Sequence, residues 1–290
     1  MEGSVIKQIV SISEPPDTIV WKVGKFLGKG AFGNVYIMSN GEKEYAAKII
    51  KKSKISIEQK VGEIKIHETL NNQNIVNLID EFETPNYFVF IMDNCEHGDM
   101  KHLIKARIRL TEPEVKYYAL NILKGIEYLH SQHIIHRDIK LANVLLCGNK
   151  LTPKITDFGL AKKLLMKGDC IKQIAGTPNY IAPEVINKQC YSYSVDIWSY
   201  GVLVYALLFG KPPFETRDVK MTYSRIRNGI YYFPNSINVS DYAKDFIKSI
   251  LVVDIDKRAN IEKLLNHPFL TRGFIPDSLP PIAAVIQPGF

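Results

Sequence analysis

Polar side chains able to transfer protons or bind cations occur in two short stretches near the middle of the chain. Asp138, Lys140 and Asn143 stand in IIHRDIKLANVLL, a short loop between apolar runs, and Asp157 ends a strand-like stretch in KITDFGLA. One carboxylate can orient a hydroxyl and accept its proton, while an Asn and a second carboxylate are hard oxygen ligands for magnesium on a triphosphate. The two stretches together predict phosphoryl transfer.

A glycine-rich stretch near the start of the chain has the pattern Gly28-x-Gly30-x-x-Gly33-x-Val35. The same spacing marks dinucleotide folds, in which a helix follows the glycines. Here a β-branched and aromatic strand, NVYIMS, follows them. A hairpin with glycines at its tip can place bare backbone N–H groups over phosphates, so we expect a nucleotide flap, the alternative being an ordinary glycine-rich hairpin.

Lys48 lies in the next strand, within YAAKII, and Glu63 lies on the helix that follows. A lysine that points into a cleft needs an acid or a bound anion, because burying it unpaired is costly. We expect Lys48 to pair with Glu63 and contact phosphate oxygens, although such a pair alone could also be a surface salt bridge.

These residues require two kinds of supporting element. Residues 22–50 alternate apolar and polar side chains as strands do, with a two-residue hairpin turn at Asn40-Gly41, and a second strand pair turns at Pro85-Asn86. A helix is expected over 56–71. Beyond Asp93 helical patterns dominate. One begins at the capping box Thr111–Glu114, and others are expected at 184–188, 195–210, 218–229, 240–252 and 261–265.

Taken in order, these motifs resemble a eukaryotic protein kinase of the serine/threonine type over about residues 22–270. The resemblance adds His136-Arg137 before Asp138, Phe158-Gly159 after Asp157, Ala182-Pro183-Glu184, Asp196 and Arg258. It implies an α+β, two-lobed fold, with a small antiparallel β-rich N-lobe that carries one main helix and a larger, mostly helical C-lobe. The expected boundaries are an extension over 1–20, a kinase domain over 21–270 (N-lobe 21–93, hinge 94–98, C-lobe 99–270) and a proline-rich tail over 271–290.

The resemblance also assigns roles. Asp138, Lys140, Asn143, Lys48 and Glu63 would be catalytic, Asn143 and Asp157 would hold Mg2+, and Thr177 would hydrogen-bond near Asp138 and Lys140. Arg258 would form a buried bridge with Glu184. The residues expected to contact ATP are Leu27, Gly28, Lys29, Gly30, Ala31, Phe32, Gly33, Val35, Ala46, Lys48, Met92, Asp93, Cys95, Asp99, Leu145 and Asp157.

Within the kinases, GTPNYIAPEVI, GKPPFET and the tail from His267 resemble the polo-like kinases. Gly33 and Val35 keep the general kinase pattern, which that subfamily commonly lacks, and the CEHGDM hinge also differs from it. The likeness implies protein substrates with acidic residues near the target, a cell-cycle role at the centrosome or spindle, and a C-terminal polo-box region that these 290 residues do not contain.

The activation segment lacks its usual switch, because no Ser, Thr or Tyr occurs from Leu160 to Ala175. Gln173 occupies the position where polo-like kinases carry a phosphorylated threonine, which Arg137 would bind. Either Gln173 or Asp169 contacts Arg137 and orders the loop without phosphate, or a partner or another modification does so. The plainest alternative is that Gln173 only packs and Arg137 serves structure.

The amino-acid composition limits the partners and the cell compartment to be expected for this chain. The net charge of +7 favours acidic partners, but no nucleic-acid-binding signature occurs, and no signal peptide or membrane span is expected. The four cysteines, at 95, 147, 170 and 190, show no paired or metal-type spacing, which favours a reducing cytoplasm or nucleus. We expect a monomeric domain. The alternative function is a pseudokinase or scaffold, against which every catalytic position is present.

Overall fold

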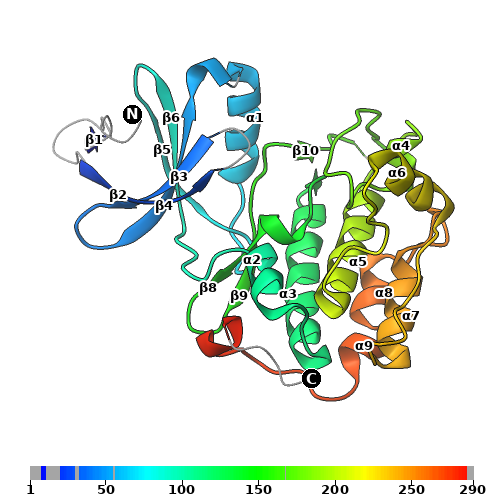
Figure 1. Cartoon of the computed structure of the whole chain (residues 1–290). Helices are drawn as coiled ribbons and strands as arrows, with labels where there is room; N and C mark the ends of the chain where they lie inside the picture. The colour runs from blue at the N-terminus through cyan, green and yellow to red at the C-terminus, as the bar shows by residue number, and fades with distance from the viewer. Residues whose placement is uncertain (1–7, 11–19, 30–32, 55, 167, 286–290) are drawn as a thin grey trace. The chain divides into compact units, whose positions relative to one another are not determined.

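The computed structural model describes residues 8–10, 20–29, 33–54, 56–166 and 168–285, in two compact units (Figure 1). Unit 1 comprises Met1–Asn71 and Val76–Cys95, and unit 2 comprises Asn72–Ile75 and Glu96–Phe290. The division after Cys95 falls within the segment 94–98 that the sequence predicts as the connector. The antiparallel sheet of unit 1 and the helices of unit 2 confirm the α+β class.

Unit 1 is built on an antiparallel sheet with the strand order β1-β2-β3-β4-β6-β5. Its bounds are β1 Gln8–Val10, β2 Val20–Lys29, β3 Gly33–Ser39, β4 Glu44–Lys51, β5 Leu78–Glu83 and β6 Tyr87–Met92. The connection between β3 and β4 has four residues rather than the expected two. The reason is that the Asn40 side chain accepts the N–H groups of Glu42 (3.1 Å) and Lys43 (3.0 Å), which closes a wider loop.

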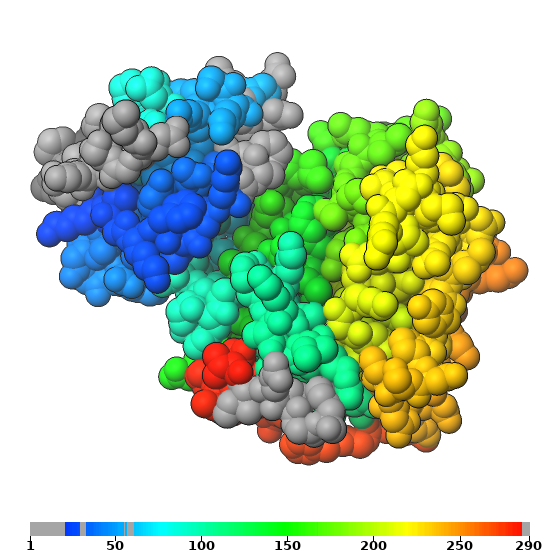
Figure 2. Space-filling view, in the orientation of Figure 1, coloured from blue at the N-terminus to red at the C-terminus, as the bar shows by residue number. Residues whose placement is uncertain are grey.

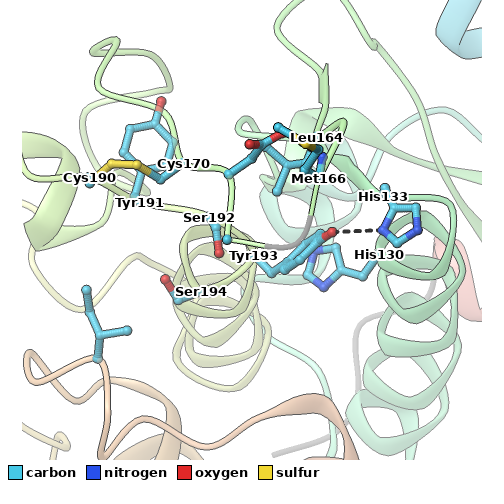
Figure 3. Close-up of a pocket in the computed structure, with 13 residues that line it drawn as sticks. His130, His133, Leu164, Met166, Cys170, Cys190, Tyr191, Ser192, Tyr193 and Ser194 are labelled. Carbon is cyan, nitrogen blue, oxygen red and sulfur yellow. Dashed lines mark hydrogen bonds between the residues drawn. A yellow bond between two sulfur atoms is a disulfide. The ribbon is translucent and has the colours of Figure 1, made fainter.

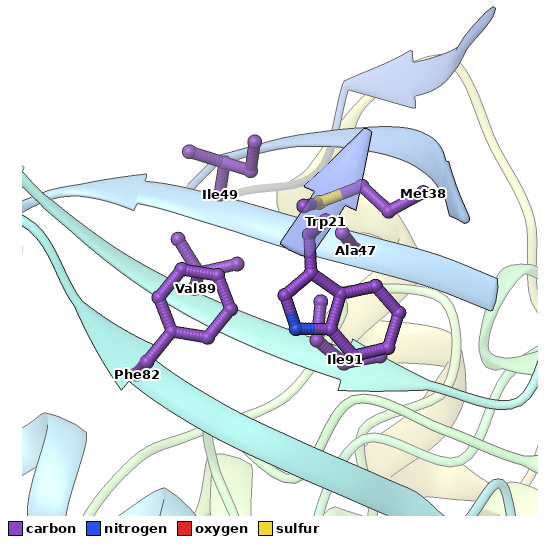
Figure 4. Packing of buried hydrophobic residues seen from close by; sticks show 7 residues of the cluster. All are labelled: Trp21, Met38, Ala47, Ile49, Phe82, Val89 and Ile91. Atoms are coloured by element: carbon purple, nitrogen blue, oxygen red, sulfur yellow. The ribbon is translucent and has the colours of Figure 1, made fainter. Parts of the chain in front are cut away.

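Two apolar clusters hold unit 1 together. One lies on a face of the sheet and contains Trp21, Met38, Ala47, Ile49, Phe82, Val89 and Ile91 (Figure 4). The other joins the sheet to α1 (Ile57–His67), where Ile64 packs with Ile50, Phe88 and Phe90. Burial of these side chains fixes α1 on the sheet, and α1 is the helix that carries Glu63.

Unit 2 is mostly helical. Its helices are α2 Met100–Arg107, α3 Glu112–Ser131, α4 Pro183–Ile186, α5 Ser194–Phe209, α6 Val219–Asn228, α7 Asp241–Ile250, α8 Ile261–Leu265 and α9 Pro268–Thr271. The capping residue predicted for α3 is in place, since Glu114 accepts the N–H of Thr111 at 2.8 Å. Helix α5 is the core of the unit, because all its residues from Val195 to Phe209 are buried.

Short strands hold the loops that carry the chemistry. Strand β8 (Val144–Cys147) pairs with β9 (Thr152–Ile155), and β7 (Ile134–Ile135) pairs with β10 (Lys162–Lys163). Residues 136–143 therefore leave β7 and enter β8, and residues 156–161 connect β9 to β10. Both ends of each functional loop are fixed by strand pairing.

The described end of the proline-rich tail lies against unit 2. The Leu279 N–H donates to the Lys150 carbonyl at 3.2 Å, and the Ala283 carbonyl accepts from Arg107. Figure 2 shows the tail as red atoms beside the blue-green residues of α2. None of the helices in the described part of the chain is long and apolar enough to cross a lipid bilayer.

Candidate active site

Asp138 is the centre of a dense hydrogen-bond network in unit 2. Its Oδ1 accepts the Thr177 hydroxyl at 2.7 Å, and its Oδ2 accepts the Lys140 ammonium at 2.6 Å and the Asn143 amide at 3.0 Å. Lys140 also donates to the Thr177 hydroxyl at 2.9 Å. The expected position of Thr177 beside Asp138 and Lys140 is thus confirmed. The carboxylate is held in one orientation by three donors.

Asn143 and Asp157 lie on adjoining loops. The Thr156 N–H donates to the Asn143 carbonyl at 3.0 Å, which brings the residue before Asp157 against the backbone of Asn143. The Asn143 amide nitrogen donates to both the carbonyl and the carboxylate of Asp138, so its side-chain oxygen is the atom left for a cation. Asp157 has a positive φ of 68°, a strained backbone that recurs at functional sites.

This donor set fits magnesium. No group of three or more His, Cys, Asp or Glu residues is arranged for a metal among the residues the structure describes. Mg2+ does not need such a cage, since it is usually held by one or two protein oxygens together with phosphates and water. Asn143 and Asp157 supply that kind of oxygen.

The buried Asp196 carboxylate fixes the backbone of the catalytic loop, residues 136–143, through hydrogen bonds. It is fully buried and accepts the N–H groups of His136 at 2.9 Å and Arg137 at 2.8 Å. Burial favours a raised pKa for this carboxyl, but the hydrogen bond and charge of His130, 2.9 Å away, and those of His136 outweigh it and lower the pKa. The ionised carboxylate therefore holds the loop in place, including Arg137 at a φ of 67°.

Arg137 links the catalytic loop to the activation segment. It donates to the Leu160 carbonyl at 2.6 Å, the side-chain oxygen of Gln173 at 3.2 Å and the Tyr191 hydroxyl at 3.3 Å. The expected Gln173–Arg137 contact is therefore confirmed. Asp169, the other expected contact, instead accepts the N–H groups of Leu165 and Met166 at 2.8 and 2.7 Å and caps a turn.

The end of the activation segment is anchored by a buried ion pair. Arg258 donates to Glu184 from both terminal nitrogens, at 2.7 and 3.0 Å, and each side chain is 1% exposed. The predicted bridge is confirmed. The fork geometry and the burial fix α4, and α4 fixes the chain that leads from Thr177.

Unit 1 brings Lys48 and Glu63 together. The Lys48 Nζ lies 2.8 Å from a Glu63 carboxylate oxygen, and both residues are 8% exposed. A surface salt bridge would be much more exposed, so that alternative is wrong. Lys48 is on β4 between alanine and isoleucine neighbours that are themselves buried, and only a paired ammonium is tolerated there.

The glycine-rich stretch is described only in part, because Gly30, Ala31 and Phe32 lie outside the described residues. A Cβ on Gly33 would collide with the Ile49 carbonyl, so this glycine is required by strand packing alone. A Cβ on Gly28 would meet nothing within 4 Å. Gly28 lies at an irregularity in the pairing of β2 with β3, between Phe26 and Gly28.

The other expected ATP contacts divide between the two units. Ala46 and Met92 are paired residues on β4 and β6, and the Asp93 side chain accepts from Asn77 at 3.0 Å. Asp99 caps α2 through the His102 N–H at 2.8 Å, a structural task beside the expected one. The remaining positions in unit 1 are Leu27 and Lys29 on β2, Val35 on β3 and Cys95 after β6, and Leu145 lies on β8 of unit 2.

Two features at the site are absent from the sequence-based expectations. Tyr191 contacts both Arg137 and Gln173, and no motif marked it. Cys170 and Cys190 form a disulfide, although the spacing of the cysteines shows no paired pattern. A separation of 20 residues carries no signal of pairing, because only the fold brings the two segments together.

Comparison with known proteins agrees with this geometry. The sequence profile of the protein kinase domain matches residues 21–270. The chain belongs to the protein kinase domain family. The match begins within β2 and extends beyond the end of α8, so it covers parts of both units.

Relatives of the kinase domain are serine/threonine kinases. It is 45% identical over 282 residues to the probable serine/threonine-protein kinase CCRP1 of Zea mays, covering 94% of this chain and 45% of the relative. The probable serine/threonine-protein kinase PLK of Dictyostelium discoideum is 43% identical, with 90% and 27% covered. Serine/threonine-protein kinase PLK1 of Xenopus laevis is 39% identical, with 99% and 49% covered. The chain thus spans half or less of each relative.

Proposed function

We propose that this kinase domain transfers the γ-phosphoryl group of ATP to serine or threonine hydroxyls of protein substrates. The observation that carries the proposal is Asp138, whose carboxylate is held by Thr177, Lys140 and Asn143 at 2.6 to 3.0 Å. Little covalent chemistry is needed from the protein in phosphoryl transfer, so positioning and charge account for most of the catalysis.

Each residue of the network has a definite task. Asp138 orients the substrate hydroxyl and accepts its proton, and Lys140, with its ammonium at the same carboxylate, steadies the negative charge of the transferring group. In the substrate complex the hydroxyl replaces the Thr177 contact or shares the carboxylate with it. The lysine at this position and the GTPNYIAPE stretch support serine/threonine specificity.

Each unit, taken by itself, carries residues suited to Mg-ATP. In unit 1, the Glu63 carboxylate lies 2.8 Å from the Lys48 ammonium and positions it for phosphate oxygens. In unit 2, Asn143 and Asp157 hold the metal. When bound, Mg2+ neutralises charge on the phosphate oxygens. Met92, at the end of β6, with Asp93 and Cys95 after it, is the segment of unit 1 proposed to contact the adenine.

The proposed substrate sequence rests on charge and on the polo-like relatives. Lys162 and Lys163 form the exposed strand β10, and Lys172 is exposed in the activation segment. These lysines suit substrates with acidic residues near the target hydroxyl. The polo-like relatives support a cell-cycle role, with the protein in the cytoplasm or nucleus and at the centrosome or spindle.

Transfer of radiolabel from ATP tests the proposal. The domain is incubated with magnesium, radiolabelled ATP and peptide panels that differ only in acidic or basic residues around one Ser, Thr or Tyr. We expect label on Ser and Thr, an acidic preference, and loss of transfer in Asp138→Asn. Label on tyrosine alone would overturn the specificity. Nucleotide binding without any transfer would favour the scaffold alternative.

A further inference from the structure

A disulfide joins the activation segment to the segment between α4 and α5. It links Cys170, three residues before Gln173, to Cys190, one residue before Tyr191 (Figure 3). The two Cα atoms are 5.5 Å apart, inside the range that a disulfide spans. Both cysteines are exposed, so small thiols and disulfides in solution can reach them.

The disulfide adjoins the contacts that hold Arg137. Directly after it, Ile171 and Tyr191 form an antiparallel bridge with backbone hydrogen bonds of 2.9 and 3.0 Å. The Tyr191 hydroxyl then donates to the Gln173 carbonyl at 2.5 Å and accepts from Arg137 at 3.3 Å. The disulfide thus lies at one end of a row of contacts between the two segments, and Arg137 is bound at the other end.

Few other interactions fix this part of the segment. A cavity of about 520 Å³ borders it, lined by His130, His133, Leu164, Met166 and both cysteines among others (Figure 3). Leu165, Met166 and Ile174 are 86%, 74% and 55% exposed, so they bury little apolar surface. The segment has no hydroxyl to phosphorylate from Leu160 to Ala175. Among the described residues around Cys170, the two backbone hydrogen bonds between Ile171 and Tyr191, the turn capped by Asp169 and the Gln173 contacts remain once the disulfide is removed.

We propose that the Cys170–Cys190 disulfide is a reversible redox switch that orders the activation segment against Arg137 and so turns the kinase on. The inference rests on the proposed kinase function and names its regulation. Closing the disulfide removes disordered conformations of the segment, and Gln173 and Tyr191 then stay at the guanidinium. Opening it releases the segment and lowers the fraction of catalytically ordered protein.

The chemistry is thiol–disulfide exchange with a small-molecule disulfide such as oxidised glutathione. The thiolate of one cysteine attacks a glutathione sulfur, forms a mixed disulfide and expels one glutathione thiolate. The second cysteine thiolate then attacks the protein sulfur of that mixed disulfide and expels the other. In all, two protein thiols are oxidised, one glutathione disulfide is reduced to two thiols, and the protons pass to those thiols. Reduced glutathione reverses both steps.

Activity measured against the disulfide content tests the switch. The phosphatase-treated domain is equilibrated with mixtures of oxidised and reduced glutathione, free thiols are alkylated in one sample and counted by mass, and phosphate transfer is measured in another. We expect activity to fall about tenfold, or about 1.4 kcal/mol, as the disulfide is reduced, and to return on reoxidation. Cys190→Ser cannot form the disulfide, so it should have the activity of the reduced domain in every glutathione mixture. Cys147→Ser, which keeps the pair, should follow the wild type.

The outcomes separate the switch from a structural disulfide and from failure of the kinase proposal. Thermal unfolding of both forms shows that each is folded at the assay temperature. A reduced domain that is less stable but equally active would make the disulfide structural and overturn the switch, as would a reduced domain that is more active. In both cases the kinase function stands. No transfer by either form would instead overturn the kinase function itself.

Discussion

The guanidinium of Arg137 contacts the side-chain oxygen of Gln173 at 3.2 Å, across 36 residues of sequence. The contact joins the catalytic loop to an activation segment that has no phosphorylatable hydroxyl from Leu160 to Ala175. A glutamine gives a hydrogen bond with one charged partner, weaker than the two-charge pair that a phosphate forms with arginine. The Tyr191 hydroxyl provides a further hydrogen bond to Arg137, and the Cys170–Cys190 disulfide holds the segments that carry Gln173 and Tyr191 together.

Changes at Gln173 should alter activity through this contact. Gln173→Ala removes the acceptor and should lower phosphate transfer by about tenfold, because a hydrogen bond to a charged group is worth about 1.5–3 kcal/mol and Tyr191 retains part of the contact. Gln173→Glu adds a charge opposite Arg137 and should keep or raise activity. Steady-state kinetics measure both. The exposed neighbour Ile174→Ala is the control, and equal activity in all variants would show that Gln173 only packs.

Lys48→Met and Asp157→Asn should leave the domain folded but nearly inactive. The first removes the phosphate-binding ammonium and the second weakens the metal ligand, each with an expected loss of about a hundredfold or more. Circular dichroism and thermal unfolding check the fold, and radiolabel transfer checks activity. Lys51→Met, at the exposed end of the same strand, should remain active. Phosphate transfer retained by either purified variant would contradict the role assigned to Lys48 or Asp157.

Glu184→Gln should destabilise unit 2 without touching a reacting atom. The change leaves the Arg258 guanidinium buried, 1% exposed, without a charged partner. The expected loss in the free energy of unfolding is about 3–5 kcal/mol. Urea unfolding measures it, with exposed Glu262→Gln as the control. A loss near zero would mean that solvent or another group compensates Arg258.

Acid should remove the stability that Asp196 contributes. Its pKa in the folded protein is lowered from 3.8, so ionisation stabilises the fold at pH values above that number, and the contribution is lost as the pH falls through the folded pKa. The difference in unfolding free energy between wild type and Asp196→Asn should therefore shrink below about pH 4. Exposed Asp277→Asn controls for the lost charge. A difference that is independent of pH would contradict the ionised carboxylate.

Most of the fold and of the catalytic network could be predicted from sequence. Alternation and capping residues are local signals, and they placed the strands of unit 1 and helices such as α3 and α5 within a few residues. Asp138, Lys140 and Asn143 share one loop, so their meeting follows from sequence alone. The Lys48–Glu63 pair follows from the cost of burying a lysine without an acid, whereas Glu184 and Arg258 are 74 residues apart and the kinase resemblance predicted their pairing.

What the sequence could not supply is contact between segments that carry no motif. Tyr191 looks like any buried aromatic residue until the bridge with Ile171 turns its hydroxyl toward Arg137. Cys170 and Cys190 lie on opposite sides of the GTPNYIAPE stretch, and only the path of that stretch brings them together. The loop at Asn40 was misjudged in length, because its side-chain hydrogen bonds, not the Asn-Gly pair, close it.

Phosphate transfer by phosphatase-treated protein tests the central claim most directly, namely that Arg137 is held without phosphate on the activation segment. The domain is purified without thiol reductant, treated with phosphatase, checked by mass for the absence of phosphate, and assayed with radiolabelled ATP under single-turnover conditions. We predict the same rate before and after treatment, and no transfer by Asp138→Asn. A large loss of rate on phosphatase treatment would contradict the claim and show that a phosphate elsewhere orders the segment.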